Sequence, residues 1–371
     1  MVNTPTILLT GACGYIGSHT WVALAQAGFD VVGVDDFSNS SPDVLPRLQR
    51  LIGQAPVFEQ VNVCNAAALD AVFARHRVDA VVHFAALKAV GESTTQPLAY
   101  YANNLGGLLT TCQVMQAHGC ARLVFSSSAT VYGAPQRLPL AEDAPLSATN
   151  PYGQTKLVSE HILQDLAQAN AAWRHVSLRY FNPVGAHESA LIGEEPRGTP
   201  NNLMPYVAQV AAGQRPYLQV FGNDYPTPDG TGVRDYLHVM DLAQGHVAAL
   251  EWLLGGGDTL TVNLGTGQGR SVLEVLNAYA RASGREIPYR ISPRRPGDVA
   301  ACWADASRAG EVLGWKALRG LGEMCGDSWR WQSSDQNQGA ADQRARLPKP
   351  IVHSHHLDAS CSSSEAEIRL L

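Results

Sequence analysis

Apolar runs of strand length alternate with helix-length segments through the first half of this 371-residue sequence. Runs such as TILLTG, DVVGVDD, AVVHFAA and ARLVFSSS show no polar alternation, and stretches with helical spacing of apolar residues separate them. Strands without alternation are buried on both faces, which is typical of a parallel sheet covered by helices. Right-handed crossovers between such strands give a doubly wound sheet. We therefore predict an α/β fold with a Rossmann-type doubly wound parallel sheet.

The first strand ends in a glycine-rich turn, TGACGYIG, that leads into the first predicted helix. Gly11, Gly14 and Gly17 form a GxxGxxG pattern, which lets the backbone approach a pyrophosphate at the positive end of a helix. Asp35 ends the second strand, where a carboxylate can accept hydrogen bonds from an adenosine ribose. A 2′-phosphate would meet like charge at Asp35 and Asp36, so the pattern predicts NAD rather than NADP. A solvated strand-end aspartate is the alternative interpretation of Asp35.

Tyr152 and Lys156 lie four residues apart at the start of a predicted helix, after the capping pair Asn150-Pro151. Their side chains therefore project from one helix face, about one turn apart. Tyrosine has an ordinary pKa near 10 and is a poor base. A cation at about 4 Å could lower that pKa by as much as about three, at an effective dielectric constant of 20. The pair is suited to move a proton from a substrate hydroxyl, although YxxxK also occurs as a plain helix-surface pair.

Three serines strengthen the catalytic interpretation of that pair. Ser126, Ser127 and Ser128 follow the apolar strand ARLVF and so lie at its carboxyl end. Ligands bind at the carboxyl ends of strands in open α/β sheets, and a hydroxyl there can hydrogen-bond a reacting oxygen. The order of glycine loop, strand-end serines and Tyr-x-x-x-Lys indicates an enzyme that removes hydride from a substrate alcohol.

The alternation of strands and helices weakens after about residue 182, and the composition changes again near the C-terminus. Pro- and Gly-rich segments such as PVGAHESALIGEEPRGTPNN come first, and Ser, Gln, Asp and isolated His dominate the end. We predict an NAD-binding Rossmann domain over 1–183 and a smaller mixed α/β substrate domain over 184–332, with some later segments returning to the first domain. We expect residues 333–371 to form a disordered tail.

Charge and cysteine content restrict the partners. The chain has 27 Lys and Arg against 33 Asp and Glu, a net charge of −6, so it has no global basic field for nucleic acid or an anionic membrane. A small anion would need local positive charge. Seven scattered cysteines without CxxC pairs or Cys/His metal spacing predict neither a disulfide framework nor a metal site. No signal-peptide pattern or apolar window of membrane length occurs, and we expect a cytoplasmic protein.

Longer stretches carry a resemblance to a known family: GACGYIGSHT, HFAALKAVGESTTQPLAYYANN, FSSSATVYG, NPYGQTK, LRYFNPVGAH, PNNLMPY, FGNDYPTPDGTGVRDYLHVMDLA and PRRPGD. From about Ile7 to Trp331 the sequence resembles the extended short-chain dehydrogenase/reductase superfamily and, within it, the UDP-glucose (UDP-galactose) 4-epimerases. The resemblance implies reversible inversion at C4 of a UDP-hexose through a 4-keto intermediate, with NAD held throughout. Tyr152 would take the 4-hydroxyl proton, and Ser128 would hydrogen-bond the C4 oxygen. Lys156 would bind the nicotinamide ribose and tune Tyr152.

Together, the motifs and the resemblance assign two binding sites. The NAD site would comprise Gly11, Gly14, Tyr15, Ile16, Gly17, Asp35, Asp36, Phe37, Ser38, Asn39, Ser40, Asn62, Val63, Phe84, Ala85, Ala86, Leu87, Lys88, Asn103, Ser128, Tyr152, Lys156 and Phe181. The UDP-sugar site would comprise Ser128, Tyr152, Asn182, Asn202, Leu203, Gln219, Val220, Phe221, Arg234, Arg295, Asp298 and Cys302.

Guanidinium groups suit a pyrophosphate, which favours the two arginines of the UDP-sugar site. Pairing of Arg234 with the neighbouring Asp235 is the alternative interpretation. Spacing does not decide between Arg294 and Arg295, and the resemblance favours Arg295.

Two positions depart from the family pattern. Many relatives have Asp-Ile or Asp-Val where this chain has Asn62-Val63, and the aspartate receives the adenine amino group. An amide oxygen can still accept that hydrogen bond, but a charge is lost. Some relatives have a tyrosine where this chain has Cys302, beside the sugar. The smaller cysteine leads to the hypothesis that the pocket also accepts the N-acetylated pair UDP-N-acetylglucosamine and UDP-N-acetylgalactosamine.

Other functions fit less well. A sugar-nucleotide 4,6-dehydratase needs an additional acid after the strand-end serine, and this chain has Ala129 and Thr130 there. A dehydrogenase that releases NADH is separated from an epimerase only by assay. A non-catalytic NAD-sensing regulator needs no Tyr/Lys pair. The family resemblance also implies a homodimer, with the long helices that begin near Pro97 and Tyr152 packed as an intersubunit four-helix bundle. Core-facing stripes are the alternative interpretation of those helices.

Overall fold

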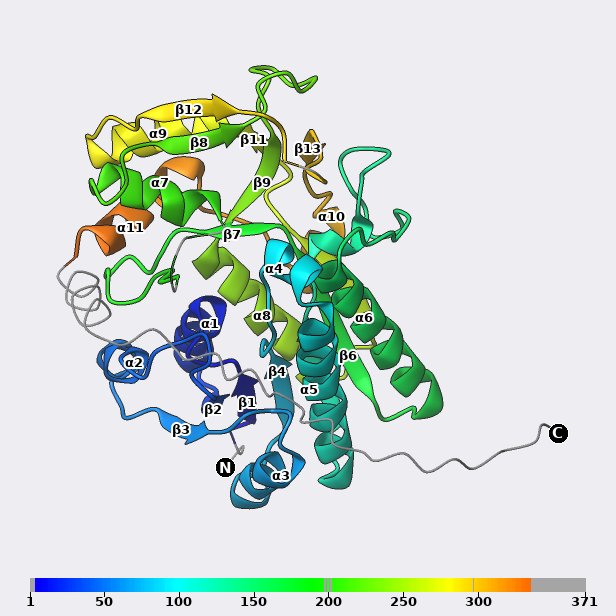
Figure 1. The fold of residues 1–371 in the computed structure, drawn as a ribbon. Helices are drawn as coiled ribbons and strands as arrows, with labels where there is room; N and C mark the ends of the chain where they lie inside the picture. Colours follow the sequence, from blue (N-terminus) through cyan, green and yellow to red (C-terminus); the bar gives the residue numbers. More distant parts are fainter. Residues whose placement is uncertain (1–3, 197, 199, 201, 296, 335–371) are drawn as a thin grey trace, which may run out of the picture.

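A computed structural model describes residues 4–334 of the chain, apart from 197, 199, 201 and 296 (Figure 1). Seven strands form one sheet in which every pairing is parallel. Their order across the sheet is β10 (Leu260–Leu264), β6 (Arg174–Tyr180), β5 (Arg122–Ser126), β4 (Ala80–His83), β1 (Thr6–Thr10), β2 (Asp30–Asp35) and β3 (Val57–Gln60). Helices cover both faces, which confirms the predicted doubly wound α/β fold.

The strands lack polar alternation because they are buried on two sides. Ile7 and Leu9 of β1 point into one hydrophobic core, whereas Leu8 between them points into a second core on the opposite face. The first core is completed by α1 (Tyr15–Gln26), α2 (Val44–Ile52) and α8 (Val239–Leu254). The second is completed by α3 (Ala66–Arg75), α5 (Pro97–Ala117) and α6 (Pro151–Ala169).

The position of β1 creates the crevice in which a ligand is expected. β1 pairs with β2 on one side and with β4 on the other. The order in which strands are added to the sheet therefore reverses at β1. A crevice opens at such a switch point outside the carboxyl ends of the strands. The loops after β1 and β4 approach closely there, since a Cβ added to Gly11 would lie 2.9 Å from the backbone nitrogen of Ala85. Gly11 therefore has a position that only glycine can occupy.

Smaller sheets and helices form a second layer above the carboxyl ends of the strands (Figure 1). One sheet contains β7 (Asn182–Val184), β9 (Val233–His238), β11 (Gly269–Ser271) and β13 (Ala301–Cys302), and another pairs β8 (Leu218–Phe221) with β12 (Tyr289–Ser292). Three helices share a third core with these strands: α7 (Leu203–Ala211), α9 (Val272–Ser283) and α11 (Leu321–Gln332). The short elements are α4 (Val90–Thr95), the 3₁₀ helix η1 (Ala129–Tyr132) and α10 (Ser307–Leu313).

The chain returns to the large sheet after leaving it. α8 packs against α1, and β10 adds the last strand beside β6. Both elements lie within 184–332 and so come from the later part of the chain. The exact division into 1–183 and 184–332 stays a prediction, and the expected tail, 333–371, lies outside the described residues apart from Ser333 and Ser334.

Candidate active site

The three residues predicted to carry the chemistry meet at the carboxyl end of β5. Asn150 caps α6 through its side chain, which accepts a hydrogen bond from the Gly153 amide at 2.9 Å. This cap fixes the first turn of α6, and with it the partly buried Tyr152. Ser128 follows β5, and its side chain lies close enough to Tyr152 to lower the pKa of the tyrosine by hydrogen bonding. The structure therefore brings Ser128 and Tyr152 into direct contact, as a shared role at one oxygen atom requires.

Lys156 lies one turn after Tyr152 and is 4% exposed. Its Nζ donates to the backbone carbonyl of Ser126 at 2.6 Å and lies 4.9 Å from the centre of the Phe125 ring. The same nitrogen lies 5.9 Å from the centre of the Tyr152 ring. Burial lowers the pKa of Lys156 to about 7, while the charge of Glu160 acts to raise it. The buried Lys156 side chain therefore titrates near neutral pH.

The pKa of Tyr152 moves in the direction opposite to the one expected from its spacing. Burial raises this pKa, and the hydrogen bond with Ser128 opposes the rise. Residue spacing reports the nearby cation but not the cost of removing a phenolate from water. Lys156 Nζ lies over the ring of Tyr152, 5.9 Å from its centre, and the burial of the hydroxyl is the larger influence on the tyrosine pKa.

The glycine loop has the geometry that a pyrophosphate needs. α1 begins after Gly14 without a side-chain cap, which leaves its first backbone N–H groups available to an anion. Gly11 has a positive φ of 65°, and Gly14 donates to its carbonyl at 3.1 Å. A Cβ on Gly17 would lie 2.2 Å from the same carbonyl oxygen. Tyr15, whose hydroxyl donates to the Gly185 carbonyl at 2.7 Å, anchors this turn to the second layer.

Asp35 is buried at the end of β2 and organises the loop that follows it. Its carboxylate accepts from the amides of Cys13 and Phe37 at 3.0 and 2.9 Å and from the Ser40 hydroxyl at 2.7 Å. The carboxylate thereby joins the glycine loop to residues 36–40 of the predicted NAD site. These contacts differ from the alternative of a merely solvated aspartate, because Asp35 is 8% exposed.

Asn62 pairs with the second acidic residue of the predicted NAD site. Its Nδ2 donates to the Asp36 carboxylate at 2.8 Å, and its Oδ1 accepts from the Cys64 amide at 2.8 Å. The neutral amide of Asn62 thus contacts the negative charge of Asp36. An aspartate at position 62 would repel that charge. Val63 beside it is buried in the second core.

The loop after β4, residues 84–88, is held by Asn104, which is not among the predicted site residues. Asn104 is buried, accepts from the Leu87 amide at 2.8 Å and donates to the Leu87 carbonyl at 3.0 Å. It also donates to Thr155 of α6 at 3.0 Å. Asn103, the predicted residue, donates to Asn104 at 3.1 Å. The periodicity of the sequence does not show which of two neighbouring asparagines contacts the loop. In the structure Asn104 makes the hydrogen bonds to Leu87.

Several predicted UDP-sugar residues gather in the second layer. The Arg295 guanidinium lies 4.9 Å from the centre of the Phe221 ring, and its Nε donates to Asp298 at 2.9 Å. Arg294 instead pairs with Asp224 at 2.8 Å and stacks on Tyr225. Of the two arginines, Arg295 is therefore the one that contacts other predicted residues. Gln219 and Val220 precede Phe221 on β8, and Gln219 is exposed.

Arg234 and Cys302 lie in register on neighbouring strands, β9 and β13. Asp235 does not pair with Arg234, because its buried carboxylate accepts from Thr266, Gly267 and Ala304. The alternative that Arg234 merely pairs with its neighbour is therefore wrong. Cys302 packs against the cluster that contains the predicted NAD-site residue Phe181.

One carboxylate touches both predicted sites. Glu194 accepts from Asn202 at 2.9 Å and forms an ion pair with Lys88 at 3.6 Å. Asn202 is the residue before α7, which begins at Leu203, and Asn182 begins β7 with its side chain exposed. Glu194 lies in the Pro- and Gly-rich segment, where no pattern marked it. Its contacts show that the predicted NAD and UDP-sugar residues border one another.

Comparison with known proteins agrees with this arrangement. Residues 8–328 match the family described as GDP-mannose 4,6 dehydratase. The chain is 57% identical over 331 residues to a UDP-glucose 4-epimerase of Bacillus subtilis (strain 168), covering 89% of this chain and 98% of the relative. It is 54% identical over 336 residues to the UDP-glucose 4-epimerase of Mus musculus, covering 89% and 97%.

Solved structures agree as well. A UDP-glucose 4-epimerase from Stenotrophomonas maltophila with bound NAD and formylated UDP-arabinopyranose superposes with a TM-score of 0.88 at 52% identity, covering 92% of this chain and 99% of that one. The Bifidobacterium longum enzyme in complex with NAD+ and UDP gives a TM-score of 0.85 at 51% identity, covering 90% and 99%. The chain belongs to the UDP-glucose 4-epimerase family. This membership confirms the resemblance found in the sequence.

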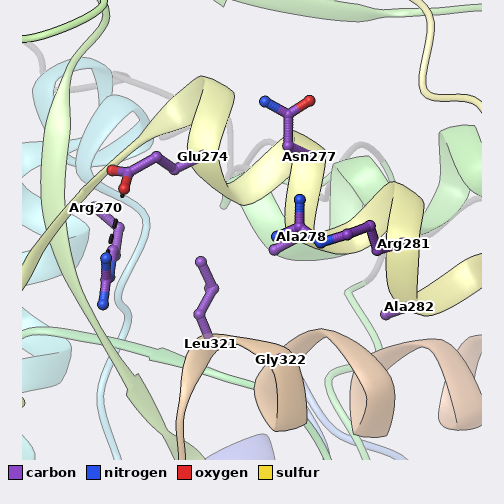
Figure 2. A pocket seen from close by; sticks show the side chains of 8 residues that line it. All are labelled: Arg270, Glu274, Asn277, Ala278, Arg281, Ala282, Leu321 and Gly322. Atoms are coloured by element: carbon purple, nitrogen blue, oxygen red, sulfur yellow. Dashed lines mark hydrogen bonds and ion pairs between the residues drawn. The ribbon is translucent and has the colours of Figure 1, made fainter.

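A groove of about 540 Å³ lies away from the predicted epimerase site, along α9 and the start of α11 (Figure 2). None of its lining residues belongs to either predicted site. In Figure 2 the Arg270 side chain lies beside Glu274, with which it forms a half-exposed ion pair at 3.5 Å. The lining residues are Arg270, Glu274, Asn277, Ala278, Arg281, Ala282, Leu321 and Gly322.

Two kinds of site are absent from the described part of the chain. Within it, no helix has both the length and the apolar character needed to cross a membrane. In the same residues, no group of three or more His, Cys, Asp or Glu side chains is placed to hold a metal ion. The three tail histidines, His353, His355 and His356, lie outside the described residues.

Proposed function

We propose that this protein interconverts UDP-glucose and UDP-galactose by inverting C4, using NAD that stays bound through the cycle. One observation carries the proposal: Ser128, Tyr152 and Lys156 are assembled at the carboxyl end of β5, with β4 between β5 and the strand that leads into the glycine loop, in a chain that is over 50% identical to UDP-glucose 4-epimerases. Fold alone would not suffice, because the same scaffold supports many reactions.

The residues present fit NAD. The uncapped start of α1 and the tight glycine turn suit its pyrophosphate. The one lone pair that Asp35 has left suits the adenosine ribose, and the adjacent Asp36 disfavours a 2′-phosphate. When bound, NAD supplies the acceptor and donor of hydride at C4. The loop held by Asn104 would form one wall of the cofactor site, with Phe181 on the sugar side.

The protein groups handle the proton at the C4 oxygen. In our proposal, Tyr152 removes the proton of the 4-hydroxyl as the ketone forms and returns it after the sugar has turned over. Ser128 donates a hydrogen bond to the same oxygen and holds the Tyr152 hydroxyl in place. The ammonium of Lys156 stabilises the phenolate form of Tyr152, offsetting the burial that raises the tyrosine pKa.

The second layer would bind the nucleotide. Arg234 and Arg295 supply the local positive charge that an acidic protein needs for a diphosphate, and Phe221 offers a ring face to the uracil. Asn182 and Asn202 add amide groups at the border with the NAD site. We propose that most of 184–332 serves this role, apart from α8 and β10.

Cys302 favours a wider range of sugars. It is partly buried, lies in register with Arg234 and packs beside the cluster that contains Phe181. A thiol at this place leaves more volume than a tyrosine would. We propose that the enzyme also interconverts UDP-N-acetylglucosamine and UDP-N-acetylgalactosamine.

We further propose a cytoplasmic homodimer. The described cysteines are free thiols, as expected in a reducing compartment. α5 packs against α6 and leaves Leu98 and Leu109 exposed at 82% and 44%, apolar groups that a second copy of the pair would cover.

One assay tests the function. The purified protein is incubated with UDP-galactose without added NAD, and the products are separated. We expect UDP-glucose to form up to the equilibrium ratio. The control is Tyr152→Phe, which should keep NAD and lose at least about 10²-fold in kcat. A dehydrated sugar, release of NADH, or a fully active Tyr152→Phe enzyme would contradict the proposal.

A further inference from the structure

A buried carboxylate outside the predicted site lies one helical turn beyond Lys156 on α6. Glu160 is 7% exposed and pairs with Arg179 of β6, with an Nε–Oε1 distance of 3.0 Å and an Nη2–Oε2 distance of 2.6 Å. The Ser127 hydroxyl donates to the same carboxylate. A buried ion pair often adds little net stability, because desolvation offsets the attraction. Stability alone is therefore a weak reason for this pair.

Glu160 continues the helix face that carries the proposed catalytic groups. Positions 152, 156 and 160 are spaced by four and so share that face. Opposite them runs the segment 126–128, and each helix residue contacts one serine of it. The three pairs are Tyr152 with Ser128, Lys156 with the Ser126 carbonyl, and Glu160 with Ser127. Ser127 lies between Ser126, which contacts Lys156, and Ser128, which contacts Tyr152. The hydrogen bond from Ser127 to Glu160 therefore fixes the middle of this segment.

Glu160 also supplies the negative charge that acts on Lys156. From β4, His83 faces the ammonium and is neutral, since burial lowers its pKa to about 3. From β5 and α6, the Phe125 and Tyr152 rings offer only their faces. Arg179 adds a second buried cation, held by Glu160. Without Glu160, two cations would remain in the dry interior with their counter-ion removed.

We propose that Glu160 is a positioning residue of the active site: its carboxylate keeps Lys156 protonated and holds the strand-end serines against α6. This inference rests on the proposed epimerase function, because it acts through Lys156 and Tyr152. Arg179 limits the effect by neutralising part of the charge of Glu160 and by fixing the carboxylate toward the serines.

The pH dependence of kcat with UDP-galactose tests this role. Protonated Lys156 is the active form, so kcat falls as the pH rises through the lysine pKa. Glu160→Gln removes the anion, and we expect the alkaline limb to move to lower pH by on the order of one unit. Glu160→Asp keeps the charge and should move the limb back toward the wild-type position. Arg179→Met leaves the glutamate charge uncompensated and should move the limb to higher pH.

A purely structural ion pair predicts a different result. Both Glu160→Gln and Arg179→Met would then lower the melting temperature while leaving the alkaline limb in place, and that outcome overturns the inference. Shifts of both variants in the same direction overturn it as well. If Glu160→Gln shows no cooperative melting, the Arg179→Met variant tests the inference by itself. Movement of its alkaline limb to higher pH supports the role of Glu160, and any other result overturns it. A wild-type protein that does not epimerise refutes the proposed function, whereas unmoved limbs in active variants refute only the role of Glu160.

Discussion

Gly17 offers a sharp test of how the cofactor is bound. A methyl group added at this position would lie 2.2 Å from the Gly11 carbonyl oxygen and 3.0 Å from its carbonyl carbon. These are backbone atoms, so no side chain can turn aside to make room. Normal contact needs roughly 1 Å more, and the glycine loop has to shift by that amount. Overpacking of this kind costs about 1–3 kcal/mol, against about 1 kcal/mol gained from the helix propensity of alanine.

We therefore expect Gly17→Ala to leave unfolding free energy unchanged or to lower it by up to about 2 kcal/mol, and to strip NAD from the purified protein. A displacement of roughly 1 Å in a positioning element can cost about 10²-fold in function. The matched control is Gly326→Ala in α11, where a methyl group meets nothing closer than the tip of Arg330 at 3.9 Å. That variant should keep NAD and gain up to about 1 kcal/mol.

The measurements are the ratio of NAD to protein after purification and urea unfolding of both variants. Loss of NAD in Gly17→Ala alone supports the close approach of loop and cofactor. A Gly17→Ala protein that keeps a full complement of NAD and unfolds like the control would refute the reasoning, because the loop would then have room for a side chain.

Two further predictions concern the sugar pocket and pH. Cys302→Tyr should lose about 10-fold or more in kcat/KM for UDP-N-acetylgalactosamine while keeping most activity on UDP-galactose, measured by product separation; equal turnover of both sugars by both proteins would contradict the pocket argument. His246 is neutral in the folded state, since burial lowers its pKa from 6.5 to about 4. Its contribution to stability is present above pH 6.5 and is lost as the pH falls toward 4. His246→Phe should therefore reduce the loss of unfolding free energy between pH 7 and pH 5 by about 2 kcal/mol, and an unchanged loss in urea titrations would show that another group titrates there.

The fold could be predicted because its signal is local. The continuous apolar run of a strand such as TILLT indicates burial on both faces of the sheet. The structure places Leu8 in one core and its neighbours Ile7 and Leu9 in another. The position of β10 was not predictable in the same way. Its run, LTVNL, does not state which strand it joins, and only the packing of α8 on α1 brings it beside β6.

The predicted active site divides along the same line. The start of α6 and the end of β5 are local signals, so Tyr152, Lys156 and Ser128 could be proposed from spacing. The charge that opposes the effect of burial on Lys156 belongs to Glu160, and Arg179, which pairs with this carboxylate, reaches it from another element. The direction of the Tyr152 pKa failed for the related reason that burial is a tertiary property.

Glu194 links residues that the sequence assigned to two separate sites. The sequence assigned Lys88 to the cofactor and Asn202 to the substrate, from stretches more than 100 residues apart. One carboxylate contacts both side chains, at 3.6 and 2.9 Å. A ligand that draws the Lys88 ammonium away would leave Glu194 with Asn202 alone, and a ligand that engages the Asn202 amide would strengthen the pull of Glu194 on Lys88. The two predicted sites therefore share the carboxylate of Glu194, and we predict that occupancy of one alters binding at the other.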